Sequence, residues 1–146
     1  MLIGINPILT PDLLHSLASM GHGDRIVIVD ANFPSAACAR RLHYLPGLNA
    51  APVLAAVLSL LPLDSFVPDP AVTMQVVDDP AAVPEVVREM TEVLERSGSK
   101  PPASIERFAF YEAARTAFAI IQTGEPRSYG NIILAKGIIA SANPAF

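Results

Sequence analysis

The segment that most restricts the fold of this chain is residues 25–30, where the sequence reads Arg-Ile-Val-Ile-Val-Asp. Branched aliphatic residues favour extended backbone, and a run of them without polar alternation is typical of a strand with both faces buried. Such strands occur in parallel or mixed sheets that helices cover on both sides. The segment therefore predicts an α/β fold, a three-layer sandwich with a central, mostly parallel sheet covered by helices.

Helical and extended segments alternate along the rest of the chain, as an α/β fold requires. The predicted helices cover residues 11–20, 52–61, 83–96 and 108–117, and the predicted strands cover residues 25–30, 40–45, 72–77, 118–122 and 131–134. The first helix has a marked start, because Thr10 can cap it and Pro11 suits its first position. The third predicted helix carries an apolar stripe at helical spacing, made of Val83, Val86, Val87, Met90 and Leu94.

The composition fits a single domain that spans residues 1–146. Hydrophobic residues make up 51% of the chain and charged residues 16%, whereas charged residues make up about 25% of a typical soluble domain. A small domain with so few charges would expose large apolar patches to water if it stayed alone. We take this as a modest indication of a homo-oligomer.

Charge and patterning disfavour two classes of partner. The net charge of −4 and the pI near 5.2, with no basic patch, argue against nucleic acid. The longest apolar stretch, residues 50–63, is interrupted by two prolines and is shorter than the roughly 20 residues of a membrane span, so we expect a core helix there and no membrane.

The first residues carry no positive charge and contain Pro7, which does not fit a secretory signal, so we expect the cytoplasm.

No cofactor and no metal are expected from the motifs. The sequence has no glycine-rich dinucleotide fingerprint, no phosphate-binding loop with a lysine and no glycine-flanked serine. Its single cysteine, Cys38, allows no intrachain disulfide, and its three histidines lack the spacing of metal ligands. Redox, phosphoryl-transfer and covalent acyl chemistry are therefore poorly supported.

His22 is the first candidate for a functional residue. It stands between Gly21 and Gly23 in the turn that enters the first predicted strand. Glycines leave room for a ligand to approach, and an imidazole can both give and take a proton near neutral pH. A structural alternative is that His22 caps the end of the preceding helix, where the helix dipole favours a positive charge.

Asp30 ends the same strand, and a carboxylate at the end of a buried strand needs partners. In α/β sheets ligands gather where strands end, so Asp30 could accept hydrogen bonds from a ligand or orient His22. Two structural alternatives stay open. Asp30 could cap the turn at residues 31–34, or it could form an ion pair with Arg107.

Two downstream segments offer further polar groups. Arg107 precedes an apolar pair, Phe108 and Phe110, and its guanidinium presents five donors in a fixed geometry. The sequence Tyr129-Gly130-Asn131 places a phenol and an amide on a tight turn, which suits hydrogen bonding to a polyol, although a purely structural turn is the alternative. Glu112 and Arg115 are spaced three apart, as expected for an exposed pair on a helix.

Taken together, these motifs resemble the L-fucose mutarotase and D-ribose pyranase family. The resemblance rests on MGHGD at 20–24, Asp30, FP at 33–34, RFAFYE at 107–112, TGE at 123–125 and YGN at 129–131, which cover most of the chain in order. Members interconvert the ring forms of free monosaccharides without a cofactor. The resemblance implies that His22 is the proton donor and that Asp30, Arg107, Tyr129, Gly130 and Asn131 bind the sugar. It also implies a ring-shaped decamer in which a neighbouring subunit completes each site.

The RFAFYE segment and the FP after Asp30 resemble the fucose branch more than the ribose branch, although Asn32 and Ser35 depart from the fucose pattern. We therefore predict a mutarotase that exchanges the α and β anomers of L-fucose, or of a related free aldose, by general acid–base ring opening and closure. The base is left open among Tyr129, Asp30 and a bound water. The alternatives are a D-ribose pyranase and a sugar-binding accessory protein without catalytic activity.

Overall fold

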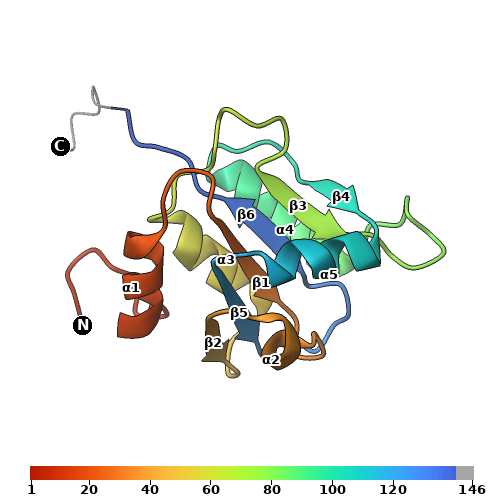
Figure 1. Cartoon of the computed structure of the whole chain (residues 1–146), viewed down its shortest axis with the longest axis horizontal. Coiled ribbons are helices and arrows are strands. Elements are labelled where there is room, and N and C mark those ends of the chain that lie inside the picture. Colours follow the sequence, from red (N-terminus) through yellow and green to blue (C-terminus); the bar gives the residue numbers. More distant parts are fainter. Residues whose placement is uncertain (141–146) are drawn as a thin grey trace.

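A six-stranded mixed sheet runs through the centre of the molecule (Figure 1), in a computed structural model that describes residues 1–140. In chain order the strands are β1 (Arg25–Val29), β2 (Leu42–Leu45), β3 (Ala71–Met74), β4 (Ala103–Ile105), β5 (Ala119–Thr123) and β6 (Ile132–Ala135). Their order across the sheet is β2-β5-β1-β6-β3-β4. Only β6 is antiparallel to its neighbours, β1 and β3, so the sheet is mostly parallel, as predicted.

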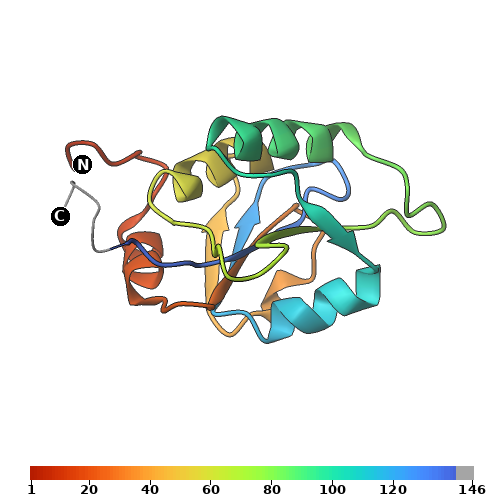
Figure 2. The same cartoon turned by 90° about the horizontal axis from the view of Figure 1, so that it is seen from above.

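Helices cover both faces of the sheet (Figure 2), which confirms the predicted three layers. They are α1 (Pro11–Ser19), α2 (Ser35–Cys38), α3 (Ala50–Leu58), α4 (Glu85–Arg96) and α5 (Arg107–Arg115). Alternate residues of β1 point to opposite faces: Ile26 and Ile28 pack in the cluster that α1, α3 and α4 contribute to, whereas Val27 and Val29 pack with Phe110 of α5. Within residues 1–140, no helix is long and apolar enough to cross a membrane.

Local sequence signals explain where the first helix lies. The Thr10 side chain accepts a hydrogen bond from the Leu13 backbone N–H at 3.3 Å and so caps the start of α1. At the other end, the Lys136 ammonium donates to the carbonyls of Leu17 and Met20, which α1 leaves without an intrahelical partner. Lys136, and not His22, therefore caps the end of α1. This is the role that one interpretation of the sequence assigned to His22.

The apolar stripe of the third predicted helix is buried as expected, except at its first residue. Val86, Val87, Met90 and Leu94 are buried, but Val83 is 54% exposed. Pro84 disfavours helical backbone at the residue before it, so α4 begins only at Glu85 and Val83 lies outside the helix.

Other predicted boundaries shift, and two short elements were missed. Helix α3 begins at Ala50 rather than 52 and ends at Leu58, since proline is tolerated within a first helical turn. The strand predicted at 72–77 ends at Met74. The one-turn helix α2 and the three-residue edge strand β4 were not predicted, because neither is long enough to show a periodic pattern.

The sheet topology gathers several chain segments at one edge. Because β1, β3 and β4 are parallel, the residues that follow them lie at the same edge of the sheet, and antiparallel β6 begins there. Asp30 and Arg107 follow strands, and Asn131 precedes β6, so all three come to this edge. His22 precedes β1 and lies at the opposite edge, where the Gly23 backbone N–H bonds the Lys136 carbonyl at 2.8 Å.

The junction between β5 and the β2–α3 loop gives a test of the packing. A Cβ atom on Gly124 would lie 1.9 Å from the Pro46 carbonyl oxygen, whereas a Cβ on Gly47 would meet open space. We expect Gly124→Ala to lower the free energy of unfolding by about 1–3 kcal/mol or more, since backbone would have to move. The control Gly47→Ala should stay within about 1 kcal/mol of the parent. Urea unfolding measures both, and equal midpoints for the two variants would contradict this packing.

Candidate active site

A cavity of about 180 Å³ opens at the edge where β1 and β3 end and β6 begins. It is lined by residues from four separate segments of the chain, and their polar and aromatic side chains include Asp30, Phe33, Arg107, Tyr111, Tyr129 and Asn131. Four of the five residues predicted to bind a sugar therefore lie together. The cavity has room for a small molecule and offers it a carboxylate, a guanidinium, a phenol and an amide.

The carboxylate of Asp30 is buried and forms no ion pair among residues 1–140. Its Oδ1 atom accepts a hydrogen bond from the Asn32 backbone N–H at 2.9 Å, and its own N–H donates to the Asn131 side-chain oxygen at 3.0 Å. Burial raises the pKa of Asp30, and hydrogen bonds to its carboxylate, chiefly from the Asn32 backbone and the Asn131 side chain, only partly oppose the rise. Asp30 thus caps the following turn, as one alternative held, and also keeps acceptor capacity that faces the cavity.

The turn that carries Tyr129 and Asn131 has an unusual backbone. Tyr129 has a φ of 70°, a left-handed conformation that is rare for residues other than glycine. Its hydroxyl oxygen accepts a hydrogen bond from the Val77 N–H at 3.2 Å. The side-chain amide nitrogen of Asn131 donates a weak hydrogen bond to the Met74 sulfur at 3.9 Å, and the amide also lies close enough to Asp30 to oppose the rise in the pKa of that carboxylate.

Gly130 lies beneath this turn rather than in the lining of the cavity. A Cβ atom there would approach the Glu125 Cγ atom at 2.9 Å and the Asp30 Cβ atom at 3.5 Å. The absence of a side chain lets the turn pack closely against Glu125, while the contact with Asp30 would be an ordinary one. Direct contact of Gly130 with a sugar stays a prediction.

Arg107, the first residue of α5, lines the cavity with a donor that has no partner. Its Nε atom is buried without a hydrogen bond among residues 1–140, and its guanidinium lies 4.6 Å from the centre of the Phe108 ring. The ion pair between Arg107 and Asp30, one alternative drawn from the sequence, does not form among residues 1–140. A buried donor without a partner is costly, so a ligand oxygen that accepts from Nε would remove that cost.

His22 is well placed for proton transfer but lies far from this cavity within one chain. Strand β1 has five residues, and at about 3.3 Å per residue it separates His22 from Asp30 by roughly 16 Å. Asp30 therefore does not orient His22, which corrects that expectation. The imidazole Nε2 atom lies 3.1 Å from the Asp64 Oδ1 atom, and the side chain remains 45% exposed.

Asp64 and Phe66 hold the His22 ring, and neither was recognised from the sequence. Asp64 is buried; its Oδ1 accepts from the Phe66 N–H at 2.9 Å, and this hydrogen bond together with His22 lowers the pKa of Asp64. The Phe66 and His22 ring centres are 5.3 Å apart. An acid directly after the apolar stretch 50–63 is the one signal that could have pointed to this pair. Among residues 1–140, no three His, Cys, Asp or Glu side chains are grouped to hold a metal ion.

Fold and site define a single-domain α/β protein with a small polar cavity at the strand ends and a carboxylate-bound histidine at the opposite edge. The chain belongs to the RbsD / FucU transport protein family, which it matches over residues 3–139. This confirms the family that the motifs indicated.

The chain is similar to several fucose mutarotases along nearly its whole length. It is 44% identical to the fucose mutarotase of Homo sapiens over 144 residues, which is 94% of each chain. A crystal structure of the fucose mutarotase from Streptococcus pneumoniae in complex with L-fucose matches with a TM-score of 0.90 and 40% identity, over 95% of this chain and 100% of that one. The structure of Bacillus subtilis RbsD complexed with D-ribose matches with a TM-score of 0.73 and 23% identity over 92% and 98%, and it supports the fold alone.

The buried Asp30 yields a prediction about stability. Because its pKa is raised in the folded protein, its ionised form is less favourable there than in the unfolded chain. Asp30→Asn keeps the shape and removes the charge, so we expect an unchanged or higher midpoint of thermal unfolding at pH 7. Any gain should vanish as the pH falls toward about 4, the ordinary pKa of an aspartate.

Thermal unfolding followed by circular dichroism at several pH values measures this. Glu92→Gln, a change on an exposed position of α4, is the control for loss of one negative charge. A clear drop in the midpoint for Asp30→Asn relative to Glu92→Gln at pH 7 would contradict the expectation.

Proposed function

We propose that this protein is an L-fucose mutarotase, which exchanges the α and β anomers of L-fucose or of a related free aldose. The observation that carries the proposal is the cavity at the strand ends. Its buried carboxylate, its unpaired guanidinium nitrogen and the phenol and amide of the turn are chemically matched to sugar hydroxyl groups, which both donate and accept hydrogen bonds. The proposal is supported by identity of 40–44% to fucose mutarotases over most of the chain.

The reaction needs one proton delivered to the ring oxygen and one removed from the anomeric hydroxyl. His22 is the proposed acid, since an imidazole exchanges protons near neutral pH and Asp64 fixes its orientation. Among the candidate bases, Asp30 is favoured, because burial raises its pKa and makes it a stronger base than an ordinary aspartate. Acid–base groups of this kind contribute roughly 10²–10⁴-fold to a rate.

In this proposal two copies of the chain form each site, because His22 and the cavity lie at opposite edges of one sheet. Exposed apolar side chains flank both places: Phe66, 69% exposed, lies beside His22, and Phe108, 61% exposed, follows Arg107. Contact between these unlike surfaces would be head-to-tail, and such contacts form a closed ring where the rotation between subunits closes. The proposed assembly is a ring-shaped homo-oligomer, a decamer as the family resemblance implies, and its proposed compartment is the cytoplasm.

The activity is tested by magnetisation-transfer NMR on equilibrated L-fucose and D-ribose. We expect the protein to accelerate anomer exchange of L-fucose more than that of D-ribose, and His22→Ala to lower the enzyme-dependent rate by roughly 10²–10⁴-fold. His15→Ala, on the exposed side of α1, is the matched control and should keep full activity. Faster exchange of D-ribose would favour a pyranase. Binding of either sugar without any acceleration would favour a non-catalytic binding protein.

The shared site is tested by mixing two inactive variants. His22→Ala removes the proposed acid and Asp30→Asn removes the proposed base, so each variant alone should be inactive. In mixed rings, about a quarter of the head-to-tail contacts pair an intact His22 with an intact Asp30. We therefore expect partial recovery of L-fucose exchange after the two variants are unfolded and refolded together.

A mixture of His22→Ala with the double variant His22→Ala/Asp30→Asn is the control and should stay inactive. Light scattering on each sample reports the size of the assembly. A monomeric protein with full activity would exclude a site shared between subunits.

A further inference from the structure

The β5–β6 connection, residues 124–131, must hold Tyr129 in a strained conformation. A non-glycine residue at φ 70° persists only where its surroundings fix it. The connection carries two of the groups that line the cavity, Tyr129 and Asn131. What fixes this segment therefore also fixes the shape of the cavity.

Glu125 is the anchor of the connection. Its side chain is 0% exposed, yet it is charged, because hydrogen bonds from Arg127 lower its pKa. Its carboxylate also accepts the Ala50 N–H at 3.4 Å, at the start of α3, where a negative charge is favourable.

The backbone of Glu125 ties the connection to both neighbours of Asp30. Its carbonyl accepts the Ala31 N–H at 2.9 Å. Its N–H donates to the Thr123 hydroxyl at 3.2 Å, and that hydroxyl donates to the Val29 carbonyl at 2.8 Å. Movement of Glu125 would thus displace the strand end that presents Asp30.

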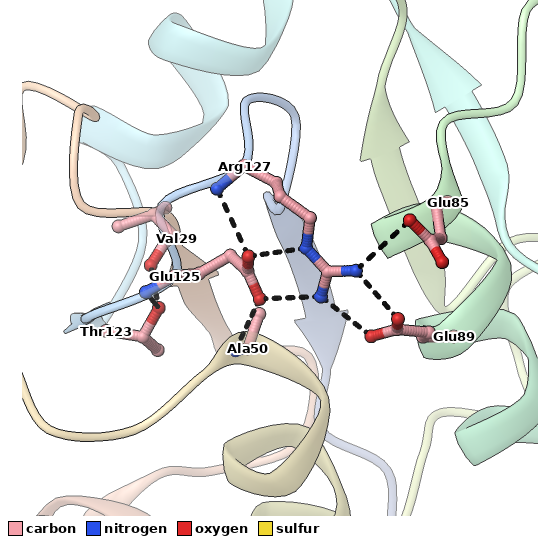
Figure 3. Close-up of polar contacts among 7 residues, drawn as sticks. All are labelled: Val29, Ala50, Glu85, Glu89, Thr123, Glu125 and Arg127. Atoms are coloured by element: carbon pink, nitrogen blue, oxygen red, sulfur yellow. Dashed lines mark hydrogen bonds and ion pairs between the residues drawn. The ribbon is translucent and has the colours of Figure 1, made fainter.

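Arg127 bridges this anchor to helix α4 (Figure 3). Its Nε and Nη2 atoms donate to the Glu125 carboxylate at 2.7 and 3.1 Å, and its Nη1 and Nη2 atoms donate to Glu89 at 2.7 and 2.8 Å. Glu85 lies further out, at 3.8 Å. The planar guanidinium therefore uses two edges, one for each carboxylate, which an ammonium group cannot reproduce.

We propose that Arg127 is a positioning residue: clamped between Glu125 and Glu89, it holds the turn at residues 129–131 in the conformation that binds the sugar. The proposal rests on the proposed function, because it assigns the cavity to a sugar. Displacement of the turn would break the pairing of a buried carboxylate, which is strongly unfavourable, so the clamp keeps the cavity formed before a ligand arrives. Arg127 itself is absent from the cavity lining, so its effect is transmitted through the turn.

The experiment compares Arg127→Lys and Glu89→Gln with Glu92→Gln. Arg127→Lys keeps the charge but cannot donate to both carboxylates from two edges, and Glu89→Gln weakens the outer half of the clamp. Glu92 lies at an exposed position of the same helix, so Glu92→Gln is the matched control for loss of one negative charge on α4. Both test changes are conservative, which guards against a variant that does not fold.

The rates of L-fucose exchange give KM and kcat, and NMR hydrogen exchange reports the Ala31 amide. We expect Arg127→Lys to raise KM roughly five- to tenfold with a smaller change in kcat, since the turn binds the sugar while His22 comes from elsewhere. Glu89→Gln should act in the same direction and less strongly. The Ala31 amide should exchange faster in both variants, and the amide of Ile28, in the middle of β1, should not.

The outcomes separate the two proposals. KM and Ala31 exchange equal to those of the parent, in an active parent, would overturn the clamp. Equal acceleration of hydrogen exchange at Ala31 and Ile28 would mean that Arg127 only contributes to global stability. That result would also overturn the clamp. If the parent neither binds nor turns over L-fucose, the proposed function fails; faster Ala31 exchange would then still support the clamp, and unchanged exchange would overturn it.

Discussion

Strand β1 is the constraint on which the rest of the molecule depends. It is buried on both faces, so it cannot tilt or slide without opening the two apolar clusters that helices form against it. Its two ends carry the two halves of the proposed site, with His22 before it and Asp30 after it. The distance between the proposed acid and the cavity is therefore set by the length of a core strand.

Three buried carboxylates differ in their partners and in the direction in which their pKa is shifted. Glu125 and Asp64 are each paired with a cation or an imidazole, and the pKa of each is lowered. Asp30 has hydrogen bonds but no ion-pair partner among residues 1–140, and burial raises its pKa. The two paired carboxylates are thus stabilised in their ionised form, while the carboxylate at the cavity is ionised less readily than an ordinary aspartate. Perturbation of this kind is typical of functional sites.

The sequence predicts the layers of the fold and most of the cavity because both depend on local patterns. The aliphatic run at 25–30 fixes a buried strand, and the YGN turn and Asp30 reach the same edge because strand ends converge in α/β sheets. Asp64 and Arg127 were not predicted, because their contacts depend on residues far away in the sequence. Asp64 meets His22, 42 residues away, and Arg127 joins its near neighbour Glu125 to Glu89, 38 residues away. No spacing in the sequence marks which distant acid meets which base.

The two halves of the proposed site are each rigid within one chain, and this bears on how an assembly can form. His22 is oriented by Asp64 and Phe66, and the turn that carries Tyr129 is held by Arg127. Subunits that meet through preformed surfaces lose little internal freedom on association, so most of the cost is the loss of overall translation and rotation. Burial of exposed apolar side chains such as Phe66 and Phe108 would offset that cost. In the proposed ring, docking alone would then bring acid and cavity together, with no folding step coupled to it.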